Sequence, residues 1–142
     1  MPQVIRTIEI RATPSKVWRH VSSLESLRKW IAPSLEIDLK VGGKYRFLGP
    51  DNKTSVSGTV MELVPEGWLI LSWLEEGQGW AHPARFVIAL EASQVGTKVT
   101  IIHDGFAATG ADWRAMVADY EQGASAHKIL EKLAALVEAD AQ

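Results

Sequence analysis

Residues 55–74 read SVSGTVMELVPEGWLILSWL, in which two apolar-rich runs flank the turn Pro65-Glu66-Gly67. Each run is short and rich in residues that favour strands, and the turn residues between them favour a tight connection. The segment therefore predicts two antiparallel strands joined by a hairpin. Because the neighbouring sequence repeats this pattern, we expect an antiparallel sheet at the centre of the fold.

Short apolar runs and frequent turn signals extend from residue 35 to residue 104. They predict six strands, near residues 35–39, 44–48, 55–63, 68–74, 82–90 and 97–103. Residues 4–10 are rich in β-branched side chains and predict one more strand at the start of the chain. The expected sheet thus has seven strands.

Two short helices are predicted after the first strand. Thr13 is a suitable N-cap and Pro14 suits a first helical turn, which predicts a helix over residues 14–21. Ser23 caps a second helix over residues 24–30, before Pro33 interrupts the pattern.

A helical period begins after Gly110 and predicts one long helix over residues 111–138, about 40 Å in length at 1.5 Å per residue. Gly123, in its middle, marks either a close backbone approach or a bend. The expected fold is α+β: a seven-stranded antiparallel sheet curved around this helix, in a single domain spanning residues 1–142. An apolar ligand cavity is expected between the sheet and the helix.

Composition excludes several classes of function. The 15 basic and 17 acidic residues give a formal charge of −2, too balanced for binding a phosphate backbone, so we expect no nucleic-acid partner. The absence of cysteine removes disulfides and thiolate metal sites. We also see no secretion signal and no apolar run of membrane-spanning length, so we expect no membrane span and a cytoplasmic location.

Four segments carry a family resemblance: residues 12–18 (ATPSKVW), 41–47 (VGGKYRF), 57–65 (SGTVMELVP) and 96–103 (GTKVTIIH). In this order they resemble the bacterial branch of the activator of heat-shock protein 90 ATPase homologue family, within the SRPBCC (START-like) superfamily. The resemblance implies the helix-grip fold. It also implies a range of functions, since family members include ligand carriers, cyclases, hydrolases and stress-related proteins.

The last helix departs from the family pattern. Family members usually carry a Gly-Trp pair there, whereas this chain has Gly123-Ala124. We expect the cavity to be wider at this point.

Strand alternation selects the candidate site residues, because side chains two positions apart share one face. It places His82 and His103 on the inner face. This pair either orients a ligand carbonyl or hydroxyl, or acts as acid and base in a cyclisation or hydrolysis, or is a buried structural feature. Arg46 and Arg85 fall on the opposite face from the apolar residues of their strands. The candidate ligand-binding residues are Trp30, Trp73, His82, Phe86, His103, Trp113, Met116 and Tyr120.

Three functions remain open. We favour the binding of a small hydrophobic or aromatic molecule, connected with a stress response, over catalysis. The alternatives are a cyclase or hydrolase acting on a small aromatic or polyketide-like substrate, and a chaperone cofactor. We expect no metal or other cofactor, because the four histidines show no ligand spacing and Gly42-Gly43-Lys44 lacks the rest of a phosphate loop. A homodimer is also possible.

Overall fold

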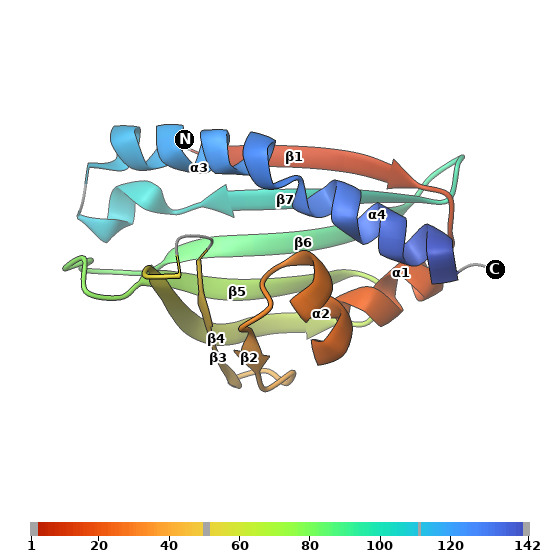
Figure 1. The fold of residues 1–142 in the computed structure, drawn as a ribbon, viewed down its shortest axis with the longest axis horizontal. Helices are drawn as coiled ribbons and strands as arrows, with labels where there is room; N and C mark the ends of the chain where they lie inside the picture. The colour runs from red at the N-terminus through yellow and green to blue at the C-terminus, as the bar shows by residue number, and fades with distance from the viewer. Residues whose placement is uncertain (1–2, 50–51, 111, 141–142) are drawn as a thin grey trace.

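The computed structural model describes residues 3–49, 52–110 and 112–140, without the side chains of residues 124–127. Figure 1 shows an antiparallel sheet with helices packed in front of it. The strands are β1 (Gln3–Ile10), β2 (Glu36–Ile37), β3 (Lys44–Leu48), β4 (Ser55–Val64), β5 (Trp68–Glu75), β6 (Ala84–Ala92) and β7 (Thr97–Asp104). The helices are α1 (Pro14–Val21), α2 (Leu24–Trp30), the 3-10 turn η1 (Phe106–Thr109), α3 (Trp113–His127) and α4 (Ile129–Asp140). The predicted α+β helix-grip fold is confirmed.

The seven strands lie in the order β1-β7-β6-β5-β4-β3-β2. Strands β2 to β7 follow one another as an antiparallel meander, and β1 pairs with β7 from Gln3↔Asp104 to Ile10↔Thr97. The first strand thus lies beside the last one. A register shift between Val60 and Glu62 interrupts the pairing of β4 with β5, and such bulges bend a sheet.

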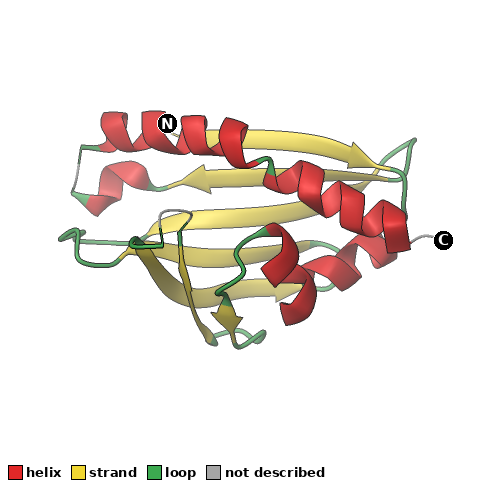
Figure 2. Cartoon of the chain, viewed as in Figure 1, coloured by secondary structure: helices red, strands yellow, loops and turns green. Residues whose placement is uncertain are grey.

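The two faces of the sheet have different environments. We call the face that packs against the helices the inner face, and the opposite one the outer face. Figure 2 shows helices in front of the sheet, and contacts join α4 to β1, α3 to β1 and α1 to β6. The inner face carries the hydrophobic core, which α4 completes with Leu130, Leu133 and Val137.

The local signals for α1 and α2 are those predicted. The hydroxyl of Thr13 accepts a hydrogen bond from the backbone N–H of Lys16, and the hydroxyl of Ser23 accepts one from Ser26. These side chains satisfy N–H groups that have no partner within the first turn of a helix. Both helices begin and end at the predicted residues.

The C-terminal helix is not continuous, and this part of the prediction is wrong. Lys128 adopts φ 50° and ψ 47°, a left-handed conformation that separates α3 from α4. Gly123, which was expected to mark either a close backbone approach or a bend, lies inside α3, and the helix does not break there. Glycine is the usual residue at a left-handed helix end, so a lysine at the break gives no sequence signal.

Two strands differ most from their predicted bounds. The strand expected over residues 35–39 is limited to Glu36–Ile37, and the strand expected over residues 82–90 is shifted to Ala84–Ala92. Pro83 has no backbone N–H to donate to a neighbouring strand, which explains why β6 begins after it.

Replacing Lys128 with glycine should stabilise the protein, because glycine adopts the left-handed conformation without a Cβ clash. We expect Lys128→Gly to raise the free energy of unfolding by about 0.5–1 kcal/mol, measured by denaturant titration. Lys132→Gly is the matched control, since Lys132 is exposed inside α4 and this change should cost about 1 kcal/mol. Equal destabilisation by both changes would contradict a left-handed break at Lys128.

Candidate functional site

An aromatic cluster occupies one end of the inner face, where β5 and β7 end and β6 begins. Phe86 pairs with His103 across β6 and β7, and Trp73 pairs with Ala84 across β5 and β6. The ring of Trp73 lies 5.1 Å from that of Phe86 and 4.6 Å from that of His103, centroid to centroid. Strand register therefore brings these three rings together.

His103 lies at the centre of the cluster. Its ring is surrounded by those of Trp73 and Phe86, by Phe106 at 4.8 Å and by Tyr120 at 4.4 Å. It is 4% exposed, and its buried Nε2 atom has no hydrogen-bond partner within the described part of the chain. A buried polar atom without a partner costs about 1–3 kcal/mol, so this atom needs an explanation.

Burial also changes the protonation of His103. Desolvation lowers the pKa of its imidazole to about 3, and the neighbouring Asp104 carboxylate opposes this change. The ring is therefore neutral at physiological pH. A neutral imidazole has one N–H donor and one acceptor nitrogen, so it can bind either a carbonyl or a hydroxyl oxygen.

Tyr120 closes the cluster from α3. Its hydroxyl accepts a hydrogen bond from Nε1 of Trp73 at 2.9 Å, and its ring stacks on Phe106 at 5.4 Å. Burial, and next the charge of Glu75, raise the pKa of Tyr120 well above its usual value. The tyrosine is thus a neutral polar group between α3 and the sheet.

An ion pair joins α3 to β1. Arg6 donates to Oε2 of Glu121 at 2.6 Å, and the two side chains are 36% and 43% exposed. An ion pair this exposed contributes at most about 1 kcal/mol. α3 is therefore held over the cluster partly by interactions that are individually weak.

The predicted site residues do not all meet. Trp73, Phe86, His103 and Tyr120 form the cluster, and the buried Met116 and half-buried Trp113 lie on α3. Arg114 lies over the indole of Trp113 at 4.9 Å. Ala124, where a wider cavity was expected, has a side chain outside the described residues.

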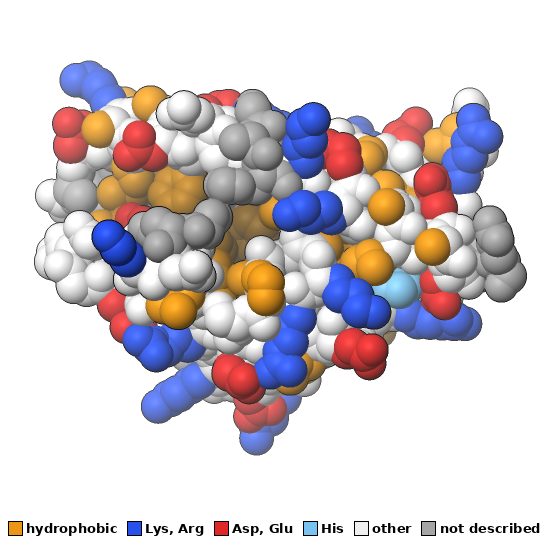
Figure 3. Space-filling model, in the orientation of Figure 1, with side chains coloured by type: hydrophobic (Ala, Val, Ile, Leu, Met, Phe, Trp, Pro, Cys, Tyr) orange, Lys and Arg blue, Asp and Glu red, His pale blue; other side chains and the backbone are white. Residues whose placement is uncertain are grey.

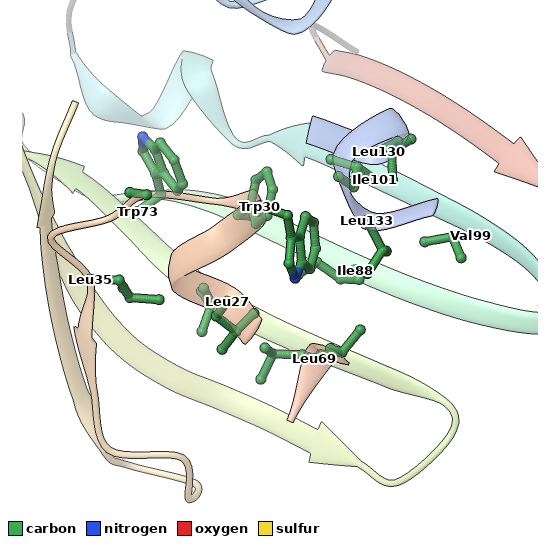
Figure 4. Close-up of a cluster of buried hydrophobic side chains, with 14 of the residues drawn as sticks. Leu27, Trp30, Leu35, Leu69, Trp73, Ile88, Val99, Ile101, Leu130 and Leu133 are labelled. Carbon is green, nitrogen blue, oxygen red and sulfur yellow. The ribbon is translucent and has the colours of Figure 1, made fainter. Parts of the chain in front are cut away.

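Trp30 belongs to the core of the protein instead. It is 1% exposed, and its Nε1 donates to the backbone oxygen of His20 at 3.0 Å. Figure 4 shows it among Leu27, Ile88 and Leu133, with Trp73 farther along the sheet. With its N–H already bonded, Trp30 has a structural role in packing.

The predicted inward orientation of His82 is wrong. His82 precedes β6 and is exposed, so it does not share the inner face with His103. Parity fails here because the alternation of β6 starts only after Pro83. The outward positions of Arg46 and Arg85 are confirmed, since Arg46 pairs with Glu76 and Arg85 with Asp104, all at the surface or partly exposed.

Sequence reasoning missed Phe106. It is fully buried in η1, a turn that Gly105 and Gly110 flank with left-handed backbones at φ 82° and φ 81°. The two glycines were a usable signal for a compact turn that returns the chain to the sheet. Tyr45 and Phe47 of β3, with rings 6.2 Å apart, extend the cluster through the contact of Phe47 with Trp73.

The space inside the protein is small. An apolar cavity of about 10 Å³ lies between α2 and the sheet, beside Trp73 and Phe86. At the surface, Figure 3 shows a hollow with hydrophobic side chains at its floor. In the shared orientation of Figures 1 and 3 this hollow lies in front of the sheet end where β5 and β7 finish. The apolar space beside the cluster is thus much smaller than the expected ligand cavity.

The described residues were also compared with the requirements of a metal site and of a membrane-spanning helix. Within residues 3–49, 52–110 and 112–140, no group of three or more His, Asp or Glu side chains is arranged to hold a metal ion. Over the same residues, no helix has the length and hydrophobicity needed to span a membrane.

The strand order, the helix-covered inner face and the aromatic cluster can be compared with known proteins. The sequence profile of the family described as Activator of Hsp90 ATPase homolog 1-like protein matches residues 11–138. This chain belongs to that family. No curated protein matches the sequence of this family member.

Solved structures of similar fold have low sequence identity to this chain. A protein from Mesorhizobium loti is 19% identical with a TM-score of 0.81, over 96% of this chain and 97% of that protein. The Aha1 dimer from Colwellia psychrerythraea is 18% identical with a TM-score of 0.71, over 93% and 94%. DynU16, a protein of the dynemicin biosynthetic locus, is 17% identical with a TM-score of 0.76, over 97% of this chain and 48% of its own. These similarities show a shared fold.

The low pKa of His103 predicts an acid-sensitive fold. The folded imidazole has a pKa of about 3, below the ordinary value of 6.5, so between these pH values the unfolded chain binds a proton that the folded chain does not. The free energy of unfolding should therefore fall as the pH is lowered from about 6.5, by about 1.4 kcal/mol per pH unit from this group. Above pH 7 the group should have no effect.

Denaturant unfolding at about pH 7.5 and pH 5 tests this linkage. His103→Leu should lose less stability on acidification than the parent protein, whereas the exposed His82→Leu should follow the parent. If His103→Leu and the parent lost equal stability, the imidazole would not be held neutral by burial.

Proposed function

We propose that this protein binds a small, flat apolar molecule that carries one hydroxyl or carbonyl oxygen, on the inner-face aromatic cluster. The observation that carries the proposal is the buried Nε2 of His103, which has no partner among the described residues and is enclosed by four aromatic rings. Membership of the family supports a role of this kind without naming a ligand.

The surroundings of His103 define the ligand chemistry. Trp73, Phe86, Phe106 and Tyr120 offer ring faces and edges, which favour a planar aromatic or polyene partner. The neutral imidazole offers one hydrogen bond and no charge, which favours an uncharged oxygen over a carboxylate. Burial of His103 without a partner becomes favourable once a ligand supplies one.

The ligand needs more room than the 10 Å³ cavity provides. We place its route at the surface hollow over the end of the sheet, with α3 moving outward to admit it. Three features support this motion: the break at Lys128, the contact of Tyr120 with Trp73 through one hydrogen bond between side chains, and the exposed ion pair from Arg6 to Glu121. α4 keeps the core closed, because its Leu130, Leu133 and Val137 stay buried.

Binding is better supported than catalysis. A general acid or base works best when its pKa lies near the operating pH, and His103, with a pKa of about 3, lies far below it. His82, the second member of the predicted acid–base pair, is exposed and outside the cluster. DynU16, the relative from a biosynthetic locus, is consistent with a small organic molecule as the ligand of this chain.

A pair of probes with equal shape tests the proposal: 2-naphthol and 2-methylnaphthalene, each displacing bound anilinonaphthalene sulfonate. The parent protein should prefer 2-naphthol by roughly two- to tenfold, since one hydrogen bond contributes about 0.5–1.5 kcal/mol and 1.4 kcal/mol is tenfold. His103→Leu should bind both probes equally. His82→Leu, the matched change at the exposed histidine, should keep the preference.

Thermal melting of each variant confirms that it is folded before the comparison. A parent protein that binds neither probe, or a preference that persists in folded His103→Leu, would overturn the proposed role of His103.

A further inference from the structure

The outer face of the sheet carries an apolar row across four strands. Pairing places Ile5 of β1 opposite Ile102 of β7, Ile102 opposite Val87 of β6, and Val87 opposite Ile70 of β5. These side chains form a line perpendicular to the strands, because paired residues in neighbouring strands point to the same face. A second row beside it contains Thr7, Thr100, Ala89, Trp68 and Val64.

This row departs from the usual pattern of a sheet with one solvated face, which alternates apolar residues inside with polar residues outside. The runs WLIL at 68–71 and FVIAL at 86–90 are instead continuously apolar, as in strands covered on both faces. Ile5 is 43% exposed and Trp68 is 40% exposed. Val87 is 7% exposed, yet it is not part of the core cluster formed by the described residues.

Charged residues border the rows. Glu62 of β4 lies opposite Ile70 and Glu9 of β1 lies opposite Lys98, and the charges of β6 and β7 alternate in sign. At one end of β6 and β7 the cationic Arg85 pairs with the anionic Asp104, and at the other end the anionic Glu91 pairs with the cationic Lys98. The two charged residues on each strand therefore have opposite signs. The two charged residues that pair across the strands also have opposite signs. Arg85 and Asp104 form an ion pair at 2.7 Å, and their side chains are 46% and 20% exposed, respectively.

Such a pattern is complementary to itself. If a second copy is rotated by a twofold axis that runs along the strands between β6 and β7, its Arg85 faces Asp104 and its Lys98 faces Glu91. If the axis runs across the strands, Arg85 faces Glu91 and Asp104 faces Lys98. Both orientations bring opposite charges together and stack the apolar rows on each other, as an isologous interface requires.

We infer that the outer face binds a second copy of this chain, with the row Ile5, Ile102, Val87 and Ile70 at the centre of a twofold dimer and the four charges at its rim. Two packed sheets would then shield an apolar strip that a solvated face rarely shows. The inference uses the face opposite to the aromatic cluster, so it stands or falls independently of the proposed ligand.

Sedimentation velocity of the full chain from about 5 µM to about 500 µM measures the association directly. We expect the parent protein to shift from monomer to dimer as concentration rises. Ile5→Glu should raise the dissociation constant at least tenfold, because it places a charge in the apolar row. Val41→Glu is the matched control, since Val41 is 65% exposed but lies in the turn between β2 and β3, and it should associate as the parent does.

The charges give a second test. Lys98→Glu and Glu91→Lys should each weaken the dimer several-fold. The double variant, which exchanges the two charges, should restore a dimer whose axis runs along the strands, and should weaken further a dimer whose axis runs across them. A parent that remains monomeric at about 500 µM overturns the inference, and so does unchanged association of folded Ile5→Glu. If the single charge changes lower the melting temperature but leave association unchanged, the charges act only within one chain and the rim assignment is wrong.

Discussion

The pairing register of β5, β6 and β7 is the constraint on which the other features depend. It aligns Phe86 with His103 on one face and Val87 with Ile102 on the other. Because side chains alternate with a period of two, a slip of one residue would exchange the two sets and expose the core. The same pairing therefore determines both the aromatic cluster under α3 and the apolar row behind it.

The position of His103 in this register carries a free-energy penalty. The strand position forces an imidazole into a space enclosed by aromatic rings, where its pKa is lowered to about 3 and its Nε2 lacks a partner. An apolar side chain at the same place would remove both penalties. Polar groups kept at such a cost are typical of functional sites, which is why the proposed ligand is centred on this atom and not on the larger tryptophans.

Much of the fold could be predicted because its signals are local. The caps Thr13 and Ser23 determine where α1 and α2 begin, and the alternation of β3 and β7 indicates which side chains are buried. The family segments then indicated the helix-grip arrangement of these elements. Strand parity alone was enough to place Trp73, Phe86 and His103 on one face.

The errors arise where the tertiary structure overrides a local pattern. A lysine in the left-handed region has no distinctive sequence signal, so the break at Lys128 could not be predicted from the helical period that continues across it. His82 satisfies the parity of β6, but Pro83 keeps it outside the strand. Phe106 is buried only because η1 returns the chain over the end of β7, a contact that depends on the whole fold.

The break at Lys128 also separates two tasks that a single helix would have combined. α4 packs Leu133 and Val137 against the core and contacts β1, α1 and α2, so its displacement would open the whole interior. α3 contacts the sheet at β1 and carries Tyr120, whose hydroxyl meets Trp73 at the edge of the cluster. A rigid helix of about 40 Å would transmit any movement at Tyr120 to the core residues of α4. With the helix divided, α3 can respond to the cluster while α4 maintains the stability of the fold.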